Sequence, residues 1–205
     1  MRVEELLAGT DDVVVAFDGP VAELPPVPVA DRLRVLVAEA PLPRRVARTG
    51  DPFAVLAHAA TIGPATARAV YAQLCRVEYE MVGQARRADG VAEAFAALTA
   101  AGTRVTVVSG LSAEAVRSFL VVHGLDGHVR HVVARNGPGD DAVGAFLRAR
   151  ADAGACVFVG STRADLAAAR AAGITAVRHR RADDPPGAEP NPWFGALSQP
   201  VRRLL

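Results

Sequence analysis

The hydrophobic and polar positions divide the chain into two parts with different patterns. Residues 12–17, and the whole segment after Asp89-Gly90, alternate between short apolar runs rich in valine and amphipathic stretches of roughly ten residues. Residues 28–85 instead form an Ala-, Leu- and Arg-rich segment with a helical pattern and no strand. Alternating strands and helices are typical of a parallel sheet with right-handed crossovers. The pattern therefore predicts an α/β core with a helical insert after its first strand.

The predicted core elements follow from these runs and from the glycines that end them. The predicted strands cover residues 12–17, 104–108, 128–134, 155–159 and 175–178, and the predicted helices cover residues 1–10, 91–101, 112–123, 140–153 and 163–172. Glycines 102, 124 and 173 follow three of these helices, at the position where a left-handed residue commonly ends a helix. Residues 183–193 are rich in proline and predict an irregular tail.

The insert is predicted to contain three helices, and its helical pattern is interrupted at Pro41–Pro43, at Gly50–Pro52 and at Gly63-Pro64. Asp51 can cap the helix that begins with Pro52, because an aspartate accepts from free amides at a helix start and proline fits the first helical position. Residues 19–27 are too rich in proline for a helix or a central strand and predict a loop. This division predicts a core formed by residues 1–20 and 88–205, with residues 21–87 inserted.

Composition narrows the possible functions. Hydrophobic residues make up 51% of the 205 residues, so the chain can bury an ordinary core. The net charge of +1 gives no electrostatic argument for nucleic acid or an anionic membrane as a partner. No apolar run approaches the length of a membrane span, which predicts a cytoplasmic protein. All 23 cationic residues are arginine, so no lysine can serve in a site.

Small or polar residues follow three of the predicted strands. They are Ala16 and Asp18, Ser109-Gly110, and Gly160-Ser161. Because the carboxyl ends of parallel strands meet at one edge of a sheet, these residues are expected to share a crevice.

The sequences around these positions resemble the motifs of the haloacid dehalogenase (HAD) superfamily of phosphatases. Val-Val-Ala-Phe-Asp-Gly-Pro-Val (14–21) is similar to the first motif, Val-Thr-Val-Val-Ser-Gly (105–110) to the second, and Val-Phe-Val-Gly-Ser-Thr-Arg-Ala-Asp-Leu (157–166) to the fourth. The resemblance is to phosphoglycolate-phosphatase-like members and covers nearly the whole chain. It implies a Rossmann-like three-layer core with a parallel sheet and an α-helical cap, here residues 21–87.

The same resemblance implies that the phosphatase chemistry is incomplete. The first motif of the family carries two aspartates, a nucleophile and an acid/base; here Ala16 stands at the nucleophile position and Asp18 at the acid/base position. Ser161 stands where the family has an acidic Mg²⁺ ligand, and Asp165 matches a supporting acid. A methyl group can neither attack phosphorus nor bind a hard cation.

The resemblance also assigns the phosphate-binding positions. Ser109 and Gly110 match residues that bind a phosphate oxygen, and Arg135 lies in the region that supplies the family's lysine. A guanidinium is larger and forked, so it does not replace an ammonium group atom for atom.

The first hypothesis is therefore a HAD-like protein that has lost phosphatase activity. It would bind a small phosphorylated or anionic ligand, or a protein partner, without a cofactor. The alternative is an active phosphatase of small phosphate esters that uses Asp18, with a shifted register that makes Asp18 the nucleophile, and Mg²⁺ as cofactor. A third hypothesis is a structural or assembly role in which the cap face forms the interface.

Other polar residues are predicted to have no catalytic role. Glu78 and Glu80 are interpreted as a solvated helix face, and the five histidines show no metal-ligand spacing. Cys75 and Cys156 are predicted to be buried free thiols.

Overall fold

Five parallel strands form the central sheet of the computed structural model, which describes residues 10–38, 41–140, 142–150 and 156–179. The strand order is β5-β4-β1-β6-β7, and the strands are β1 (Asp12–Ala16), β4 (Arg104–Ser112), β5 (Val129–Arg135), β6 (Cys156–Gly160) and β7 (Thr175–Arg178). Every strand pairs in parallel with its neighbours. The predicted α/β class and parallel sheet are confirmed.

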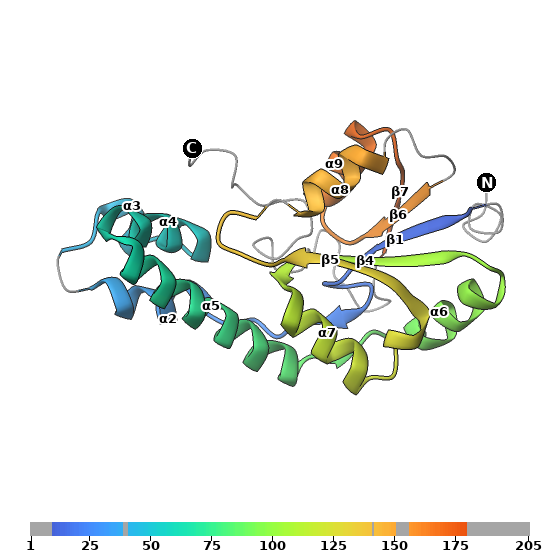
Figure 1. Cartoon of the computed structure of the whole chain (residues 1–205), viewed down its shortest axis with the longest axis horizontal. Coiled ribbons are helices and arrows are strands. Elements are labelled where there is room, and N and C mark those ends of the chain that lie inside the picture. Colours follow the sequence, from blue (N-terminus) through green and yellow to red (C-terminus); the bar gives the residue numbers. More distant parts are fainter. Residues whose placement is uncertain (1–9, 39–40, 141, 151–155, 180–205) are drawn as a thin grey trace.

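Helices cover both faces of this sheet and give the three layers (Figure 1). They are α6 (Val91–Ala100), α7 (Ala113–Val122), α8 (Ala142–Arg150) and α9 (Arg163–Ala171). Val13 and Val15 of β1 belong to the apolar cluster that includes α6 and α7, whereas Val14 and Ala16 belong to the cluster that includes α8 and α9. Successive side chains of a strand point to opposite faces, so the central strand joins both halves of the core.

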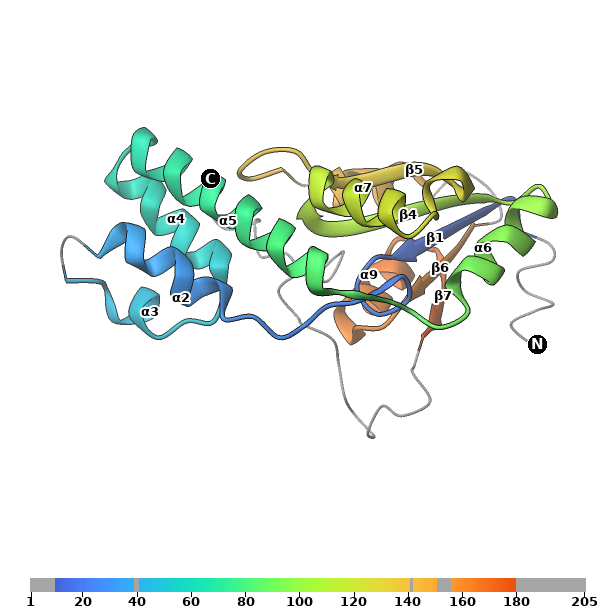
Figure 2. The same cartoon turned by 90° about the horizontal axis from the view of Figure 1, so that it is seen from below.

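The helical segment between β1 and α6 lies at one end of the sheet (Figures 1 and 2). It contains α2 (Val29–Arg34), the 3₁₀ turn η1 (Val35–Val37), α3 (Arg44–Ala47), α4 (Pro52–Ile62) and α5 (Pro64–Gln84). The described residues of this segment thus form four α-helices where three were predicted. Asp51 caps α4 as expected, since its carboxylate accepts from the Phe53 amide at 2.8 Å.

A short antiparallel ribbon closes the base of the helical segment. Its strands are β2 (Ala22–Glu23) and β3 (Arg86–Arg87), and Arg86 forms an exposed ion pair with Glu23 at 2.8 Å. The prediction of a simple loop over residues 19–27 was therefore wrong at β2. The division into core residues 1–20 and 88–205 and a cap of residues 21–87 stays a prediction.

Strand β4 is longer than predicted. The sequence pattern ended it at Val108, but the strand continues to Ser112, which pairs with Arg135 of β5 after a register shift. Helix α7 therefore begins at Ala113, and Ser112 precedes it without a side-chain capping bond. The predicted helix at residues 1–10 and the predicted tail lie outside the described residues, apart from Thr10. No helix of the described ranges is long and apolar enough to span a bilayer.

Candidate functional site

The register of the central strands brings the predicted site residues to one end of the sheet. Ala16 pairs with Val108, and the Phe17 amide donates to the Val108 carbonyl at 2.9 Å. On the other side of β1, Val15 pairs with Val159. Asp18 and Ser161 therefore follow the ends of β1 and β6, as the sequence motifs predicted. Ser109 was predicted to follow its strand, but it lies within β4, one residue after the Ala16 partner Val108.

Ala16 is an apolar position. It is 2% exposed and lies in a cluster with Val14, Val108 and Phe158. The end of the central strand thus presents a methyl group to a packed apolar environment, and no oxygen is available there to attack a substrate or coordinate a cation.

Asp18 lies in a tight turn that the chain makes directly after β1. The amides of Val21 and Ala22 both donate to the Phe17 carbonyl, at 3.2 and 2.9 Å, and the Gly19 amide donates to Ala22 at 2.8 Å. Gly19 has φ 94°, a backbone conformation that glycine adopts without strain. The turn fixes the position of Asp18, which is only 6% exposed.

The N-terminus of α9 follows β6, the neighbour of β1, and lies at the same end of the sheet as the predicted crevice. The Thr162 hydroxyl oxygen accepts from the Asp165 amide at 3.0 Å and caps the helix. Ser161 and Asp165 are both buried, at 7% and 1% exposure. With Asp18, this end of the sheet has two buried carboxyl groups.

Removing the Thr162 cap tests how much this hydrogen bond stabilises the start of α9. We expect Thr162→Ala to lower the free energy of unfolding by about 1 kcal/mol, because one amide of the first turn loses its acceptor. Urea denaturation measures the change. The control is Thr99→Ala, whose hydroxyl only donates to the Phe95 carbonyl of its own helix. An equal loss in both variants would contradict a capping role.

Ser109 is held within β4. Its hydroxyl oxygen accepts from the Leu111 amide at 3.1 Å, and the side chain is 1% exposed. The hydroxyl keeps its own proton for donation, so the predicted phosphate-binding role of Ser109 and Gly110 stays a prediction.

Arg135 is buried against the helical segment. It forms an ion pair with Glu78 of α5, its Nε donates to the Gly110 carbonyl at 3.3 Å, and it is 3% exposed. Its guanidinium lies 5.0 Å from the ring centre of Tyr71 and 5.7 Å from that of Phe53. Aromatic faces at these distances attract a cation.

Glu78 is the site residue that the sequence interpretation missed. It was expected on a solvated face, but it is fully buried and accepts from the Ser112 amide at 2.9 Å as well as from Arg135. Glu80, by contrast, is exposed as expected. The available signal was helical spacing, because Glu78 follows Leu74 by four residues and precedes Met81 by three, both of them buried.

The pKa values of both members of the buried pair are raised, for different reasons. Burial is the largest single effect on the pKa of Arg135 and lowers it, but the attractions of Glu78, Tyr71 and Cys75 together raise the pKa of the guanidinium above its ordinary value. Burial also raises the pKa of Glu78, more than Arg135 and the Ser112 amide lower it. Burial raises the pKa of Tyr71 to about 12, despite the opposing effect of Arg135. Arg135 is thus paired with Glu78 where the resemblance would place a free cation.

The residues at the ends of β1 and β6 do not fit the Mg²⁺ that the resemblance implies for an active enzyme. Mg²⁺ requires several oxygen ligands, with carboxylates among them. Ala16 offers no oxygen and Ser161 offers an uncharged hydroxyl. Within the described residues, no group of three or more histidine, cysteine or acidic side chains could hold a metal ion.

The two cysteines differ in burial. Cys156 is buried as predicted, whereas Cys75 on α5 is partly exposed, so the prediction of a buried thiol was wrong for Cys75. Neither cysteine forms a disulfide with another described residue.

Comparison with known proteins identifies the fold. No family model matches the chain. No curated protein sequence matches it either. Among solved structures, a predicted phosphoglycolate phosphatase from Haemophilus somnus matches with a TM-score of 0.57 and 17% identity, over 82% of this chain and 84% of that chain.

Two further structures show the same similarity. CbbY from Rhodobacter sphaeroides, in complex with phosphate, matches with a TM-score of 0.54 and 16% identity over 87% of this chain and 92% of that chain. A HAD-superfamily hydrolase of subfamily IA from Geobacter sulfurreducens matches with a TM-score of 0.50 and 20% identity over 83% and 88% of the two chains.

Proposed function

We propose that this chain, which has a HAD-like, phosphoglycolate-phosphatase-like fold, acts by binding and does not transfer phosphoryl groups. The observation that carries the proposal is Ala16, a buried methyl group at the end of the central strand, where the resemblance places the nucleophile. Ser161 and the absence of lysine from the sequence support it, because each removes a further charged group of the phosphatase reaction.

A protein partner is a better candidate than a small phosphorylated or anionic ligand. The crevice contains the carboxyl groups of Asp18 and Asp165, and Glu78 cancels the charge of Arg135. Carboxylates without a bound cation repel an anion. Titration with inorganic phosphate tests the small-ligand candidate directly, and saturable binding that Ser109→Ala weakens would favour it.

The loss of activity predicts a clear assay result. Purified protein is expected to show no Mg²⁺-dependent turnover of p-nitrophenyl phosphate or of sugar phosphates, since the nucleophile and two charged groups are missing. The measurement compares wild type with Asp18→Asn, and with Asp11→Asn as an exposed control. Turnover that needs Mg²⁺ and disappears only in Asp18→Asn would contradict the proposal.

The same measurements can establish the alternative, an active phosphatase that uses Asp18. In that case Asp18 would form an acid-labile phosphoenzyme or bind BeF₃⁻, and native mass spectrometry would detect the added mass. An unmodified mass together with no turnover rules this alternative out.

A further inference from the structure

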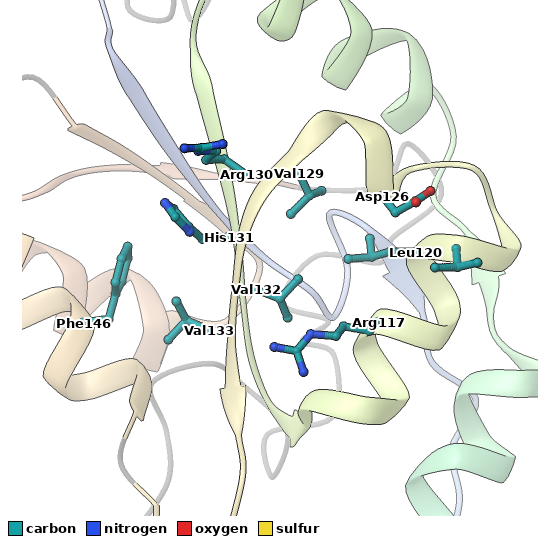
Figure 3. A pocket seen from close by; sticks show the side chains of 10 residues that line it. Arg117, Leu120, Asp126, Val129, Arg130, His131, Val132, Val133 and Phe146 are labelled. Atoms are coloured by element: carbon teal, nitrogen blue, oxygen red, sulfur yellow. The ribbon is translucent and has the colours of Figure 1, made fainter.

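A cavity of about 640 Å³ lies along the outer edge of β5, away from the crevice (Figure 3). It is lined by the segment from Val129 to Val133, whereas Arg135 at the crevice lies at the other end of the same strand. Strand β5 is the last strand of the sheet, and its outer edge pairs with no strand of the described chain. Such an edge has backbone amides and carbonyls available for a further strand.

The cavity has walls on both faces of the sheet. In Figure 3, Val132 points to the side of α7, where Arg117 and Leu120 lie, while His131 and Val133 point to the side of α8 and Phe146. An extended segment laid along β5 would place its side chains alternately on these two sides. The shape therefore fits a strand better than a compact small molecule.

The charged side chains of the cavity are mainly basic. Arg117 and Arg130 are exposed and form no ion pair with any other described residue, and arginine stays charged at every physiological pH. His131 adds a ring that can donate or accept hydrogen bonds. Asp126 is the one acidic residue among the described lining residues. Valine side chains between these groups add apolar surface, and Val121 at the rim is 62% exposed.

We propose that this groove binds an acidic peptide segment in an extended conformation, which adds to the sheet beside β5. Backbone hydrogen bonds would give affinity, and Arg117 and Arg130 would select for carboxylate side chains. A second copy of this chain fits less well, because its own β5 edge would bring a further Arg117 and Arg130 to a groove that is already basic.

The test uses a fluorescent octapeptide of alternating glutamate and valine, with a lysine-valine octapeptide as control. Fluorescence anisotropy is expected to show saturable binding of the acidic peptide, weakened by added salt. The Arg117→Glu/Arg130→Glu double variant is expected to bind about tenfold or more weakly, because two attractions become repulsions. Arg44→Glu/Arg45→Glu, a charge-matched change on exposed residues of α3, is expected to bind as wild type does.

Two further measurements distinguish strand pairing in the groove from non-specific electrostatic binding. An acidic octapeptide that is N-methylated along one edge keeps its charges but loses strand pairing, and it is expected to bind about tenfold more weakly. Equal binding of the acidic and basic peptides, or equal losses in both double variants, would overturn the proposal. A dimer in sedimentation velocity that Arg117→Glu/Arg130→Glu alters would assign the groove to a second copy instead. None of these results depends on the crevice, so they stand apart from the phosphatase assay.

Discussion

Replacing Glu78 by alanine is expected to lower the free energy of unfolding by about 3 to 5 kcal/mol, the range for removing one partner of a buried ion pair. The substitution leaves the guanidinium of Arg135 buried without a counter-ion and the Ser112 amide without its acceptor. Both groups are far from solvent, so water cannot replace the carboxylate. Urea denaturation at neutral pH measures the change.

Three further variants identify the cause of this loss. Glu78→Gln keeps an acceptor for Ser112 and Arg135 and is expected to cost less than about 2 kcal/mol. Glu80→Ala removes an exposed carboxylate from the same helix and is expected to unfold as wild type does. Glu78→Leu combined with Arg135→Met is expected to recover most of the stability, because apolar side chains can replace a buried ion pair. Equal losses in Glu78→Ala and Glu80→Ala would contradict the structural role of the pair.

The raised pKa of Glu78 also predicts how stability changes with pH. The folded chain holds this proton more tightly than the unfolded chain, in which the pKa is near 4.5. The free energy of unfolding therefore has a contribution from Glu78 that is complete below that value and is lost as pH rises through the raised pKa. Glu78→Gln removes this contribution, so its stability is expected to fall less than that of wild type over this range.

Ala16→Asp has the second large expected effect. Restoring the carboxylate that the resemblance implies is expected to lower the free energy of unfolding by about 3 kcal/mol or more at neutral pH, because a charge enters an apolar cluster without a cation. Asp18, two residues further along the chain, adds a second carboxyl group nearby. The variant is also expected to remain inactive as a phosphatase, since Ser161 and the absence of lysine are unchanged.

The matched control is Ala16→Asn, which has nearly the same size and shape without the charge. Burial raises the pKa of an introduced aspartate, so the Asp variant is expected to approach the Asn variant in stability as pH falls through that raised value. Thermal unfolding at several pH values measures the difference. If Ala16→Asp is as stable as wild type at neutral pH, or gains Mg²⁺-dependent turnover, the crevice can still accommodate a phosphatase site.

The sequence was sufficient to predict the sheet because the core strands have clear boundaries. The valines of β1 and the turn at Gly19 specify a buried strand and its end without reference to the rest of the chain. Ser112 could not be placed in this way. Its amide bonds to Glu78, which lies 34 positions earlier, and this contact accompanies the extension of β4 beyond Val108.

The role of Glu78 depends on the same long-range contact. A charged residue is usually solvated, and the residues that bury Glu78 come from α5, β4 and β5, which are separate in the sequence. Its partner Arg135 was identified as a site residue because the resemblance places it in the region that supplies the family's lysine, but its counter-ion could only be found in three dimensions. The cavity beside β5 was missed for a related reason: the strand order, and not the composition of β5, makes that strand an edge.

The ribbon of β2 and β3 indicates where insertions and deletions can occur without disturbing the sheet. Residues 22–23 and 86–87 pair directly, so the chain leaves the sheet and returns to it at almost the same point. A segment whose two ends meet can be lengthened, shortened or exchanged between relatives without moving a strand of the sheet. Natural variation among related chains is therefore expected to concentrate between Leu24 and Ala85. Within this segment, Glu78 is expected to be retained, because it contacts Ser112 and Arg135 of the core.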